Sequence, residues 1–328
     1  MIDPLDKRRN AIRPDCAAAH LKESVERARY AEPTRRAIAV PSARCRIGPD
    51  LETFDTEFLF GEPVDVFAVD DGEQRGEDNA AGGTLLPRHW SWVQSAVDGY
   101  VGYVETDALR APGPAPTHKV GVPAAVLYDE PTIKKGNVGR LPLGALVTVP
   151  EVIKAAETYA RVEVSWRPHR NGPRARQAKD HAFILIQHLK PIDARIADWV
   201  AIAHDFVGTP YVWGGKSYEG IDCSGLVQAA LQAAGLAAPR DSDMQLEELG
   251  TIVPDSAALT RGDLIFWRGH VGIMMDEDHL LHANGHHMLT VVEPLREAVD
   301  RLANQGLPIL QRKRIDPSGP LLRGTMRA

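Results

Sequence analysis

The chain has 328 residues, 44% of them hydrophobic, and a formal net charge of −6 at pH 7. This length suits two or three domains rather than one core, and the acidic balance does not favour nucleic acid or an anionic membrane surface as a partner. The N-terminal stretch MIDPLDKRRNAIRPD has no apolar run of the signal-peptide kind, and no stretch approaches the roughly 18 apolar residues of a membrane span. We therefore expect a cytoplasmic protein without nucleic-acid or membrane partners.

Residues 1–36 are polar and charged, so we predict an N-terminal arm that lies on the body of the protein. The run HLKESVERARYA, residues 20–31, favours a partly helical arm, although its apolar face is small. From residue 37 the sequence changes to short β-rich runs broken by Asp, Gly and Pro. This pattern predicts a first small β-barrel over residues 37–111.

A second barrel is predicted because the same pattern returns later in the chain. Residues 111–119, APGPAPTHK, have the composition of a linker. Residues 120–191 then repeat the order of a strand, a Gly-containing turn before an apolar strand, a paired strand and a closing strand near a Leu. Two small barrels in tandem fit this order better than one large sheet.

The last segment, residues 192–328, alternates helical and strand patterns and predicts an α+β domain. We expect one helix capped by Asp193 and stopped by Gly208, and a second helix from Cys223 to a stop at Gly235. Strands are expected to follow at residues 264–267, 270–275 and 279–284.

A Gly-rich loop leads directly into the helix that begins at Cys223, and Asp222 stands where an N-cap belongs. A thiol in the first turn feels the helix dipole and free backbone N–H groups, and both favour the reactive thiolate. The same N–H groups can bind the oxyanion that forms when a carbonyl is attacked. Cys223 is therefore the predicted nucleophile, whereas Cys16 and Cys45 lack such a setting and are predicted to be structural.

A nucleophilic thiol also needs a base, and two histidines are candidates. His270 opens one predicted strand and His282 lies on the next, with a turn near Asp276–Asp278 between them. Antiparallel neighbours of this spacing bring the two imidazoles together. We predict that His270 deprotonates Cys223 and that His282 holds the His270 ring in the useful tautomer.

These segments resemble the NlpC-type family of papain-like cysteine peptidases. The matching signatures, in the family's order, are Tyr211–Gly215, Asp222–Gly225, Pro239–Ser242, Arg261–Leu264, His270–Ile273 and His282–Ala283. The resemblance implies a papain-like catalytic domain over residues 192–328. It also implies hydrolysis of bacterial cell-wall peptides, typically after γ-linked D-glutamate, without a metal or organic cofactor.

The two barrels upstream, which resemble bacterial SH3-like domains, make the chain similar to γ-D-glutamyl-L-diamino-acid endopeptidases, whose partners are murein stem peptides. In that group the first barrel binds the free amine of L-Ala. The resemblance assigns this role to Asp55, in FDTEFLFG, and Tyr100, in GYVGYV, together with Asp222. Asp55 is one methylene shorter than the Glu expected there.

Four further residues lie in the family's signatures. The resemblance implies that Tyr211 lines the site near the thiol, and that Ser224 and Ser242 hold the carboxylate of γ-D-Glu, although both are also ordinary helix-start hydroxyls. Trp213 is expected to support the core. The leaving residue, L-Lys or meso-diaminopimelate, is left open, as is the oligomeric state.

Three alternatives stay open. A metal site near His282, His286 and His287 is disfavoured because no Cys pair or His-x-x-x-His helix accompanies them. A wall-fragment binding protein with an inactive hydrolase domain is a second alternative, disfavoured because the Cys and both His residues are present. Acyl transfer on the same fold is the third.

Overall fold

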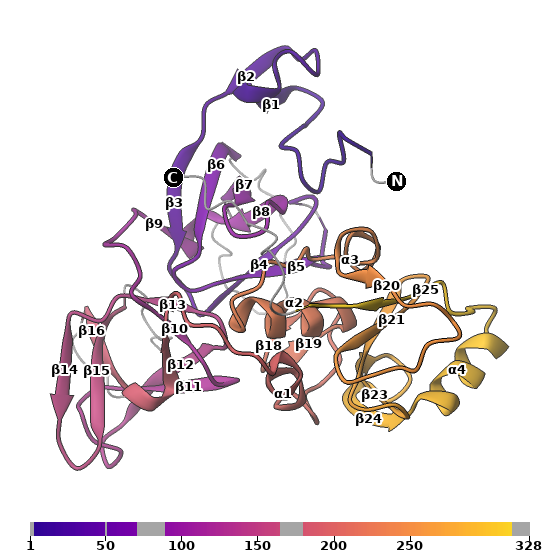
Figure 1. Cartoon of the computed structure of the whole chain (residues 1–328). Coiled ribbons are helices and arrows are strands. Elements are labelled where there is room, and N and C mark those ends of the chain that lie inside the picture. Colours follow the sequence, from indigo (N-terminus) through magenta and orange to yellow (C-terminus); the bar gives the residue numbers. More distant parts are fainter. Residues whose placement is uncertain (1–2, 50, 71–88, 165–179, 317–328) are drawn as a thin grey trace, which may run out of the picture.

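The computed structural model describes residues 3–49, 51–70, 89–164 and 180–316. The predicted arm, barrels and C-terminal domain include residues 1–2, 50, 71–88, 165–179 and 317–328, which lie outside the described residues. In Figure 1 two β-rich units and a C-terminal α+β region meet around the helix α2. The predicted domain boundaries stay a prediction.

Contrary to the prediction, residues 20–31 of the N-terminal arm contain no α-helix. Cys16–Ala18 (β1) pairs in parallel with Arg29–Ala31 (β2), and a single 3₁₀ turn follows β1 at Ala19–Leu21. Ala17, Ala18 and Leu21 are buried in one apolar cluster with Phe67 and Trp92. These contacts outweigh the weak helical preference of a segment that has no broad apolar stripe.

The first β unit is a five-stranded antiparallel sheet in the order β8-β7-β6-β3-β9, with a two-stranded ribbon β4-β5 beside it. A bridge between Arg46 and Tyr103 ties the ribbon to β8. The core of the first β unit contains Phe58, Val93 and Tyr100. The elements are Thr34–Ile38 (β3), Ser42–Cys45 (β4), Thr56–Leu59 (β5), Pro63–Asp70 (β6), Trp90–Ser95 (β7), Val101–Glu105 (β8), the 3₁₀ turn Thr106–Ala108 (η2) and Leu109–Arg110 (β9).

The second β unit combines a five-stranded sheet, β12-β11-β16-β15-β14, with a three-stranded sheet, β13-β10-β17. As in the first unit, a 3₁₀ turn directly precedes the last strand. Its interpretation as a second SH3-like barrel stays a prediction. The elements are His118–Val120 (β10), Ala124–Tyr128 (β11), Asn137–Pro142 (β12), Leu146–Val147 (β13), Glu151–Lys154 (β14), Thr158–Glu163 (β15), His181–Leu185 (β16), Ile186–His188 (η3) and Leu189–Pro191 (β17).

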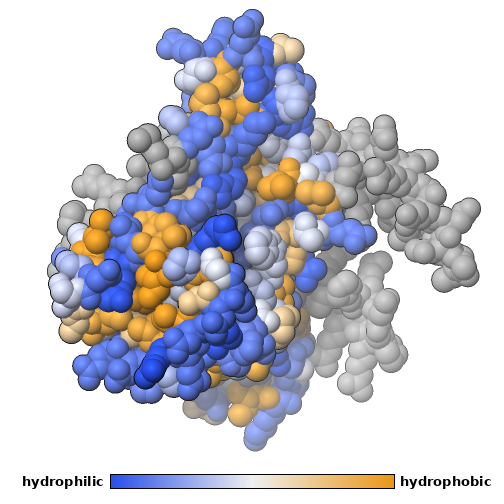
Figure 2. Space-filling model, turned by 90° about the vertical axis from the view of Figure 1, so that its right-hand side faces the viewer, coloured by the Kyte–Doolittle hydropathy of each residue, from blue (hydrophilic) through white to orange (hydrophobic). Residues whose placement is uncertain are grey.

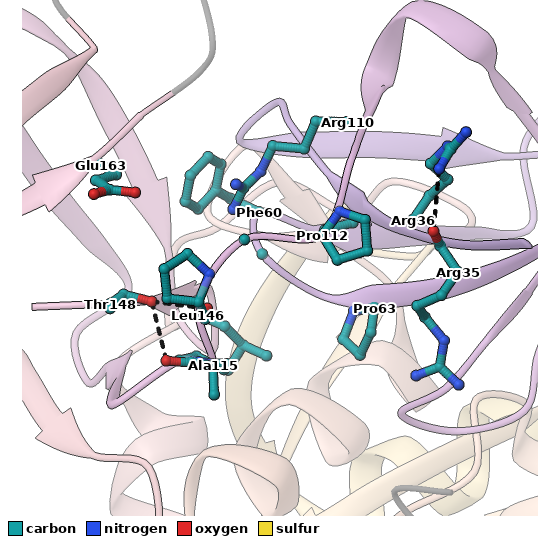
Figure 3. A pocket seen from close by; sticks show the side chains of 15 residues that line it. Arg35, Arg36, Phe60, Pro63, Arg110, Pro112, Ala115, Leu146, Thr148 and Glu163 are labelled. Carbon is teal, nitrogen blue, oxygen red and sulfur yellow. Dashed lines mark hydrogen bonds between the residues drawn. The ribbon is translucent and has the colours of Figure 1, made fainter. Parts of the chain in front are cut away.

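The two β units touch directly. The backbone N–H of Leu146 donates to the carbonyl of Phe60 across 2.8 Å. Beside this contact, residues of both units and of the linker enclose a cavity of about 250 Å³ (Figure 3). In that cavity the Arg110 guanidinium lies 5.5 Å from the centre of the Phe60 ring. These contacts connect the second unit to the turn after β5, the strand of the first unit that reaches the candidate site.

The C-terminal domain is a six-stranded sheet in the order β20-β25-β21-β22-β23-β24. Alternate residues of β21 face opposite sides: Leu264 and Phe266 pack with α1 and α2, while Ile265 and Trp267 pack with α4. The elements are Trp199–His204 (α1), Lys216–Ser217 (β18), Gly220–Ile221 (β19), Cys223–Ala233 (α2), Ser242–Glu248 (α3), Thr251–Ile252 (β20), Asp263–Trp267 (β21), His270–Met274 (β22), His279–Asn284 (β23), Leu289–Pro294 (β24), Leu295–Asn304 (α4) and Gln311–Arg314 (β25).

Helix α1 begins later than expected. Its N-cap is Asp198, whose carboxylate accepts from the Ala201 N–H, and not Asp193. The residues in between are held by other partners: the Ile196 N–H donates to Ala234 at the end of α2, and the carbonyl of Ala194 accepts from Lys119 Nζ. These contacts prevent the helix from starting at the first available cap.

The face of the molecule at the right of Figure 1 is mostly hydrophilic, with smaller hydrophobic areas between (Figure 2). Ile252 and Leu310 of the C-terminal domain are among the exposed apolar residues of the described part of the chain. In the described residues, no helix has the length and apolar character to cross a membrane.

Candidate active site

Cys223 is the first residue of α2, as predicted, and the loop before it is built on close backbone contacts. The Asp222 carboxylate caps the helix by accepting from the Gly225 N–H at 2.6 Å. A Cβ on Gly225 would lie 2.3 Å from the carbonyl oxygen of Gly215, so only glycine lets the loop pack on the helix. The first-turn N–H groups point out of the helix, beside the thiol.

Cys223 is 6% exposed, and its thiol lies beside the beginning of β22, at Val271. Burial, followed by the negative charge of Asp222, raises the pKa of this thiol to about 12, against opposing hydrogen bonds from the backbone N–H groups of Val271 and Ser224. Val271 follows His270 directly. At neutral pH the resting sulfur is therefore protonated and needs a base when it attacks.

His270 and His282 are brought together as the spacing predicted. His270 Nε2 lies 2.9 Å from His282 Nδ1, and the ring of Trp267 packs 5.6 Å from that of His270. This contact leaves Nδ1 of His270 as the ring nitrogen for the thiol. In the described residues no hydrogen bond joins His270 to Cys223; such contacts often tighten only when substrate is bound.

Two charged residues that the sequence analysis missed continue this arrangement. His282 Nε2 lies 2.7 Å from Glu293 Oε1, and Arg301 Nη1 donates to Glu293 Oε2 at 2.9 Å. In the β23–β24 register His282 faces Val291, so Glu293 is its diagonal neighbour on the same face. We call His270, His282, Glu293 and Arg301 the His–Glu chain.

The pKa values of the His–Glu chain describe its resting state. Burial, followed by the charges of His282 and Arg301, lowers the pKa of His270 to about 3, and burial also lowers that of His282. Burial opposes ionisation of Glu293, but hydrogen bonds with His282 and Arg301 outweigh it and lower its pKa to about 2. Both imidazoles are therefore neutral at pH 7, and the carboxylate is charged.

On the other side of the thiol, Asp222 and Arg240 form a buried ion pair of 2.7 Å. Arg240 also donates to Ser224 Oγ at 2.9 Å and to Thr56 Oγ1, also at 2.9 Å. Asp222 accepts from the Gly214 N–H as well. Asp222 and Ser224 thus lie beside Cys223 as predicted, but both are already engaged within the protein.

The first β unit reaches this buried pair through β5 and the residue before it. Glu57 accepts from the N–H of Lys216 in β18 at 2.8 Å, a few residues before α2. Asp55 is half-buried; one of its oxygens accepts from the Ile47 N–H, and the other has no partner in the described part of the chain. Burial raises the pKa of Asp55, with the charge of Arg240 opposing, so its ionised form lacks a close cation.

Tyr100 lies at the same junction, although its hydroxyl contacts a residue that the sequence analysis did not single out. Its hydroxyl donates to Asp241 Oδ2 at 3.3 Å, and Arg8 of the N-terminal arm donates to the same oxygen at 2.8 Å. Burial raises the pKa of Tyr100 and also that of Asp241, the latter against the charges of Arg240 and Arg8. The Pro239–Ser242 signature contains Asp241, but nothing local indicates its partners.

The remaining predicted residues have different surroundings. Tyr211 is half-buried, and burial followed by the charge of Cys223 raises its pKa, which places it near the thiol. Ser242 begins α3, and its hydroxyl makes no hydrogen bond within the described residues. Trp213 is 65% exposed and does not support the core; the tight turn at Gly214 (φ +79°), packed on Phe54, directs it outward.

The other cysteines and the neighbouring histidines lie apart from this arrangement or pack on one another. Cys16 and Cys45 are fully buried in the cores of the arm and the first β unit. The rings of His286 and His287 pack edge to face. Across the described ranges, no group of three or more His, Cys, Asp or Glu side chains is arranged to hold a metal ion.

Comparison with known families assigns this arrangement to a class. Residues 208–301 match the NlpC/P60 family, and residues 86–109 match the bacterial dipeptidyl-peptidase SH3 domain. The chain therefore carries a catalytic domain of the NlpC/P60 family of cysteine peptidases, together with an SH3-like domain.

Individual relatives extend the comparison. The chain is 29% identical over 170 residues to a γ-D-glutamyl-L-lysine dipeptidyl-peptidase of Bacillus cereus, which covers 49% of this chain and 47% of the relative. It is 44% identical over 89 residues to a probable endopeptidase of Haemophilus influenzae. This match covers 25% of this chain and 54% of the relative. The chain thus spans about half the length of these curated relatives.

The fold is shared with a crystal structure of an NlpC/P60 family protein from Bacillus cereus. The TM-score is 0.63 at 20% identity, and the match covers 86% of this chain and 99% of the other. The likeness therefore extends beyond the catalytic domain to the upstream β units.

Proposed function

We propose that this protein hydrolyses the γ-D-glutamyl–diamino acid bond of murein stem peptides with a free N-terminal L-Ala and releases L-Ala-γ-D-Glu. The observation that carries this proposal is that Asp55 and Tyr100, both from the first β unit, lie within the electrostatic reach of Arg240, which pairs with Asp222 beside Cys223. The name of the Bacillus cereus relative, a γ-D-glutamyl-L-lysine dipeptidyl-peptidase, supports the same bond. We propose further that both β units are SH3-like barrels, and that the substrate is recycled peptide in the cytoplasm.

The proposed chemistry begins with attack of Cys223 Sγ on the γ-carbonyl carbon. The thiol proton passes to Nδ1 of His270, and the backbone N–H of Cys223 stabilises the oxyanion. The tetrahedral intermediate collapses when the protonated His270 gives its proton to the leaving amine, which leaves a thioester. Water, deprotonated by His270, then hydrolyses the thioester and releases the dipeptide.

The free amine of L-Ala is proposed to bind Asp55 and Tyr100. Because the Tyr100 hydroxyl donates to Asp241, its oxygen lone pairs remain available to accept from an ammonium. The unpartnered oxygen of half-buried Asp55 gains a cation when the amine binds. Asp222 is proposed to act on the substrate through Arg240 and α2 rather than by contact.

The γ-D-Glu carboxylate is proposed to bind the unpartnered hydroxyl of Ser242. Ser224 already donates to Asp222 Oδ1 at 3.2 Å and accepts from Arg240, so its predicted contact with the carboxylate requires rearrangement. Tyr211 is proposed to line the thiol side of the cleft. No cofactor takes part in this mechanism.

The deciding experiment is mass spectrometry of products from L-Ala-γ-D-Glu-L-Lys, its meso-diaminopimelate analogue and their N-acetylated forms. We expect L-Ala-γ-D-Glu from the free peptides and a fall in kcat/KM of at least about 100-fold for the acetylated ones, since each lost charge-assisted contact costs on the order of 1.5–3 kcal/mol. Equal rates for free and blocked amines would contradict the amine site. Binding without turnover would favour the binding-protein alternative, and capture of an added amine would favour acyl transfer.

A further inference from the structure

The outer half of the His–Glu chain lies on the side of the sheet opposite the helix that carries Cys223. Leu280, two residues before His282 on β23, packs in the apolar cluster that contains Ala298 of α4. Side chains alternate along a strand, so His282 faces α4 as well. Glu293 ends β24, and its carboxylate is 9% exposed, with His282 on one side and Arg301 of α4 on the other.

We propose that Glu293 and Arg301 are positioning residues, which select the ring tautomers of His282 and His270 and so keep Nδ1 of His270 free to take the thiol proton. This inference rests on the proposed function of Cys223 and His270. It assigns a task to two residues that touch neither the thiol nor the substrate.

The tautomers follow from one hydrogen bond to the next. A charged carboxylate only accepts, so His282 Nε2, 2.7 Å from Glu293 Oε1, carries a proton. A neutral imidazole has one N–H, so Nδ1 of His282 is then an acceptor. It receives the Nε2 proton of His270 over 2.9 Å. The second nitrogen of His270, Nδ1, therefore keeps its lone pair, as a general base must.

Arg301 keeps this direction of hydrogen bonding from reversing. It donates through both terminal nitrogens to the two oxygens of Glu293, which holds the carboxylate charged and fixes its plane. If Glu293 were protonated, its O–H could donate to His282 Nε2 instead, and in Glu293→Gln the amide N–H could do the same. The two histidines would then switch tautomer, and a proton would occupy Nδ1 of His270.

The His–Glu chain also predicts two opposite shifts with pH. Removing the negative charge of Glu293 destabilises a protonated His270, whereas removing the positive charge of Arg301 stabilises it. We call the part of the pH–rate profile of Cys223 in which protonation of His270 lowers the rate the acid limb. This limb should therefore move to lower pH in Glu293→Gln and to higher pH in Arg301→Gln. Other charged groups that face this region stay unchanged in both variants; they are His287, 4.0 Å from Glu293 Oε1, Glu297 beside Arg301, and Asp222 and Arg240 beyond the thiol.

The test measures the rate at which iodoacetamide alkylates Cys223 between pH 2 and 9, a range that includes the pKa of His270, followed by mass spectrometry of the peptide that contains it. Wild type is compared with Glu293→Gln, Arg301→Gln and Arg301→Lys. Arg296→Gln is the matched control, because Arg296 lies on the same helix with its side chain 92% exposed. Alkylation needs no murein peptide, so its outcome is independent of the substrate proposed above.

We expect alkylation at pH 7 to slow by about 10- to 100-fold in Glu293→Gln, with the two opposite shifts of the acid limb. Arg301→Lys should keep the wild-type limb because it keeps the charge. The Arg301 variants change a partly exposed side chain on a helix surface, so they decide the question even if Glu293→Gln does not fold. A folded Arg301→Gln whose rate and acid limb match those of Arg296→Gln would overturn the inference.

Discussion

Two ion pairs lie on opposite sides of Cys223, and they differ in how far they are buried. The Asp222–Arg240 pair is almost fully enclosed, with side chains 9% and 1% exposed, and it binds α2, the preceding loop and the first β unit together. The Glu293–Arg301 pair ends nearer to solvent, since Arg301 is 20% exposed. The enclosed pair acts as a scaffold, whereas the pair nearer to solvent is proposed to set the tautomers of the histidines beside it.

The largest expected effect comes from the residue between the two pairs. Cys223→Ala should fold normally and lose turnover by on the order of 10⁴-fold or more, because no other group in the site can form the thioester. The measurement is kcat/KM on the free stem peptide, with thermal unfolding as a check of the fold. Residual activity close to that of wild type would exclude the thiol mechanism.

Breaking the enclosed pair should cost more stability than breaking the other one. Arg240→Met leaves the buried carboxylate of Asp222 without its cation and should lower the free energy of unfolding by about 3–5 kcal/mol. Arg301→Gln should lower it by only about 1 kcal/mol, since its pair is screened by solvent. Urea unfolding of both variants, with Arg296→Gln as the control, measures the difference; equal losses would contradict the comparison.

Substitutions of His282 test the His–Glu chain without removing a charged residue. His282→Ala should lower kcat by about 100-fold, because His270 loses the acceptor that holds its ring. His282→Gln and His282→Asn should retain part of the activity, since an amide oxygen can accept the same hydrogen bond. If all three variants had the kcat of wild type, His282 would have no orienting role.

The histidine side also predicts a dependence of stability on pH. The pKa of His270 is about 3 in the folded protein and about 6.5 when unfolded, so the unfolded state binds the proton first. Stability is then fully present above pH 6.5 and falls as the pH drops from 6.5 toward 3, by about 1–3 kcal/mol after allowance for partial exposure. Urea midpoints from pH 7 to 5 should fall less in His270→Gln than in wild type; parallel curves would refute this.

The local parts of the site could be predicted because neighbouring residues determine them. Asp222, Cys223 and Gly235 mark the beginning and end of α2, and the structure confirms both: the carboxylate caps the first turn, and Gly235 takes φ +89° after the last. The strands β22 and β23 were predicted from their apolar runs. The short turn between them brings His270 to His282.

Elsewhere local signals pointed the wrong way. Residues 20–31 have the composition of a solvated helix, but their last three residues form β2, which pairs with β1, because the apolar residues of the arm pack on Phe67 and Trp92 of the first β unit. Asp193 is a good cap in isolation, but the chain after it binds the end of α2. In both places tertiary contacts outweigh propensities of a few tenths of a kcal/mol per residue.

The sequence by itself determined the class of chemistry, because a thiol at a helix start and two histidines on adjacent strands depend on short-range spacing. Only the tertiary structure decided which charges surround them. Arg8 reaches Asp241 over 233 positions of sequence, and Glu293 meets His282 only through the β23–β24 register. A charged residue on a strand has the sequence pattern of a solvent-exposed one, so no local signal distinguishes Glu293 until the packing of α4 buries it.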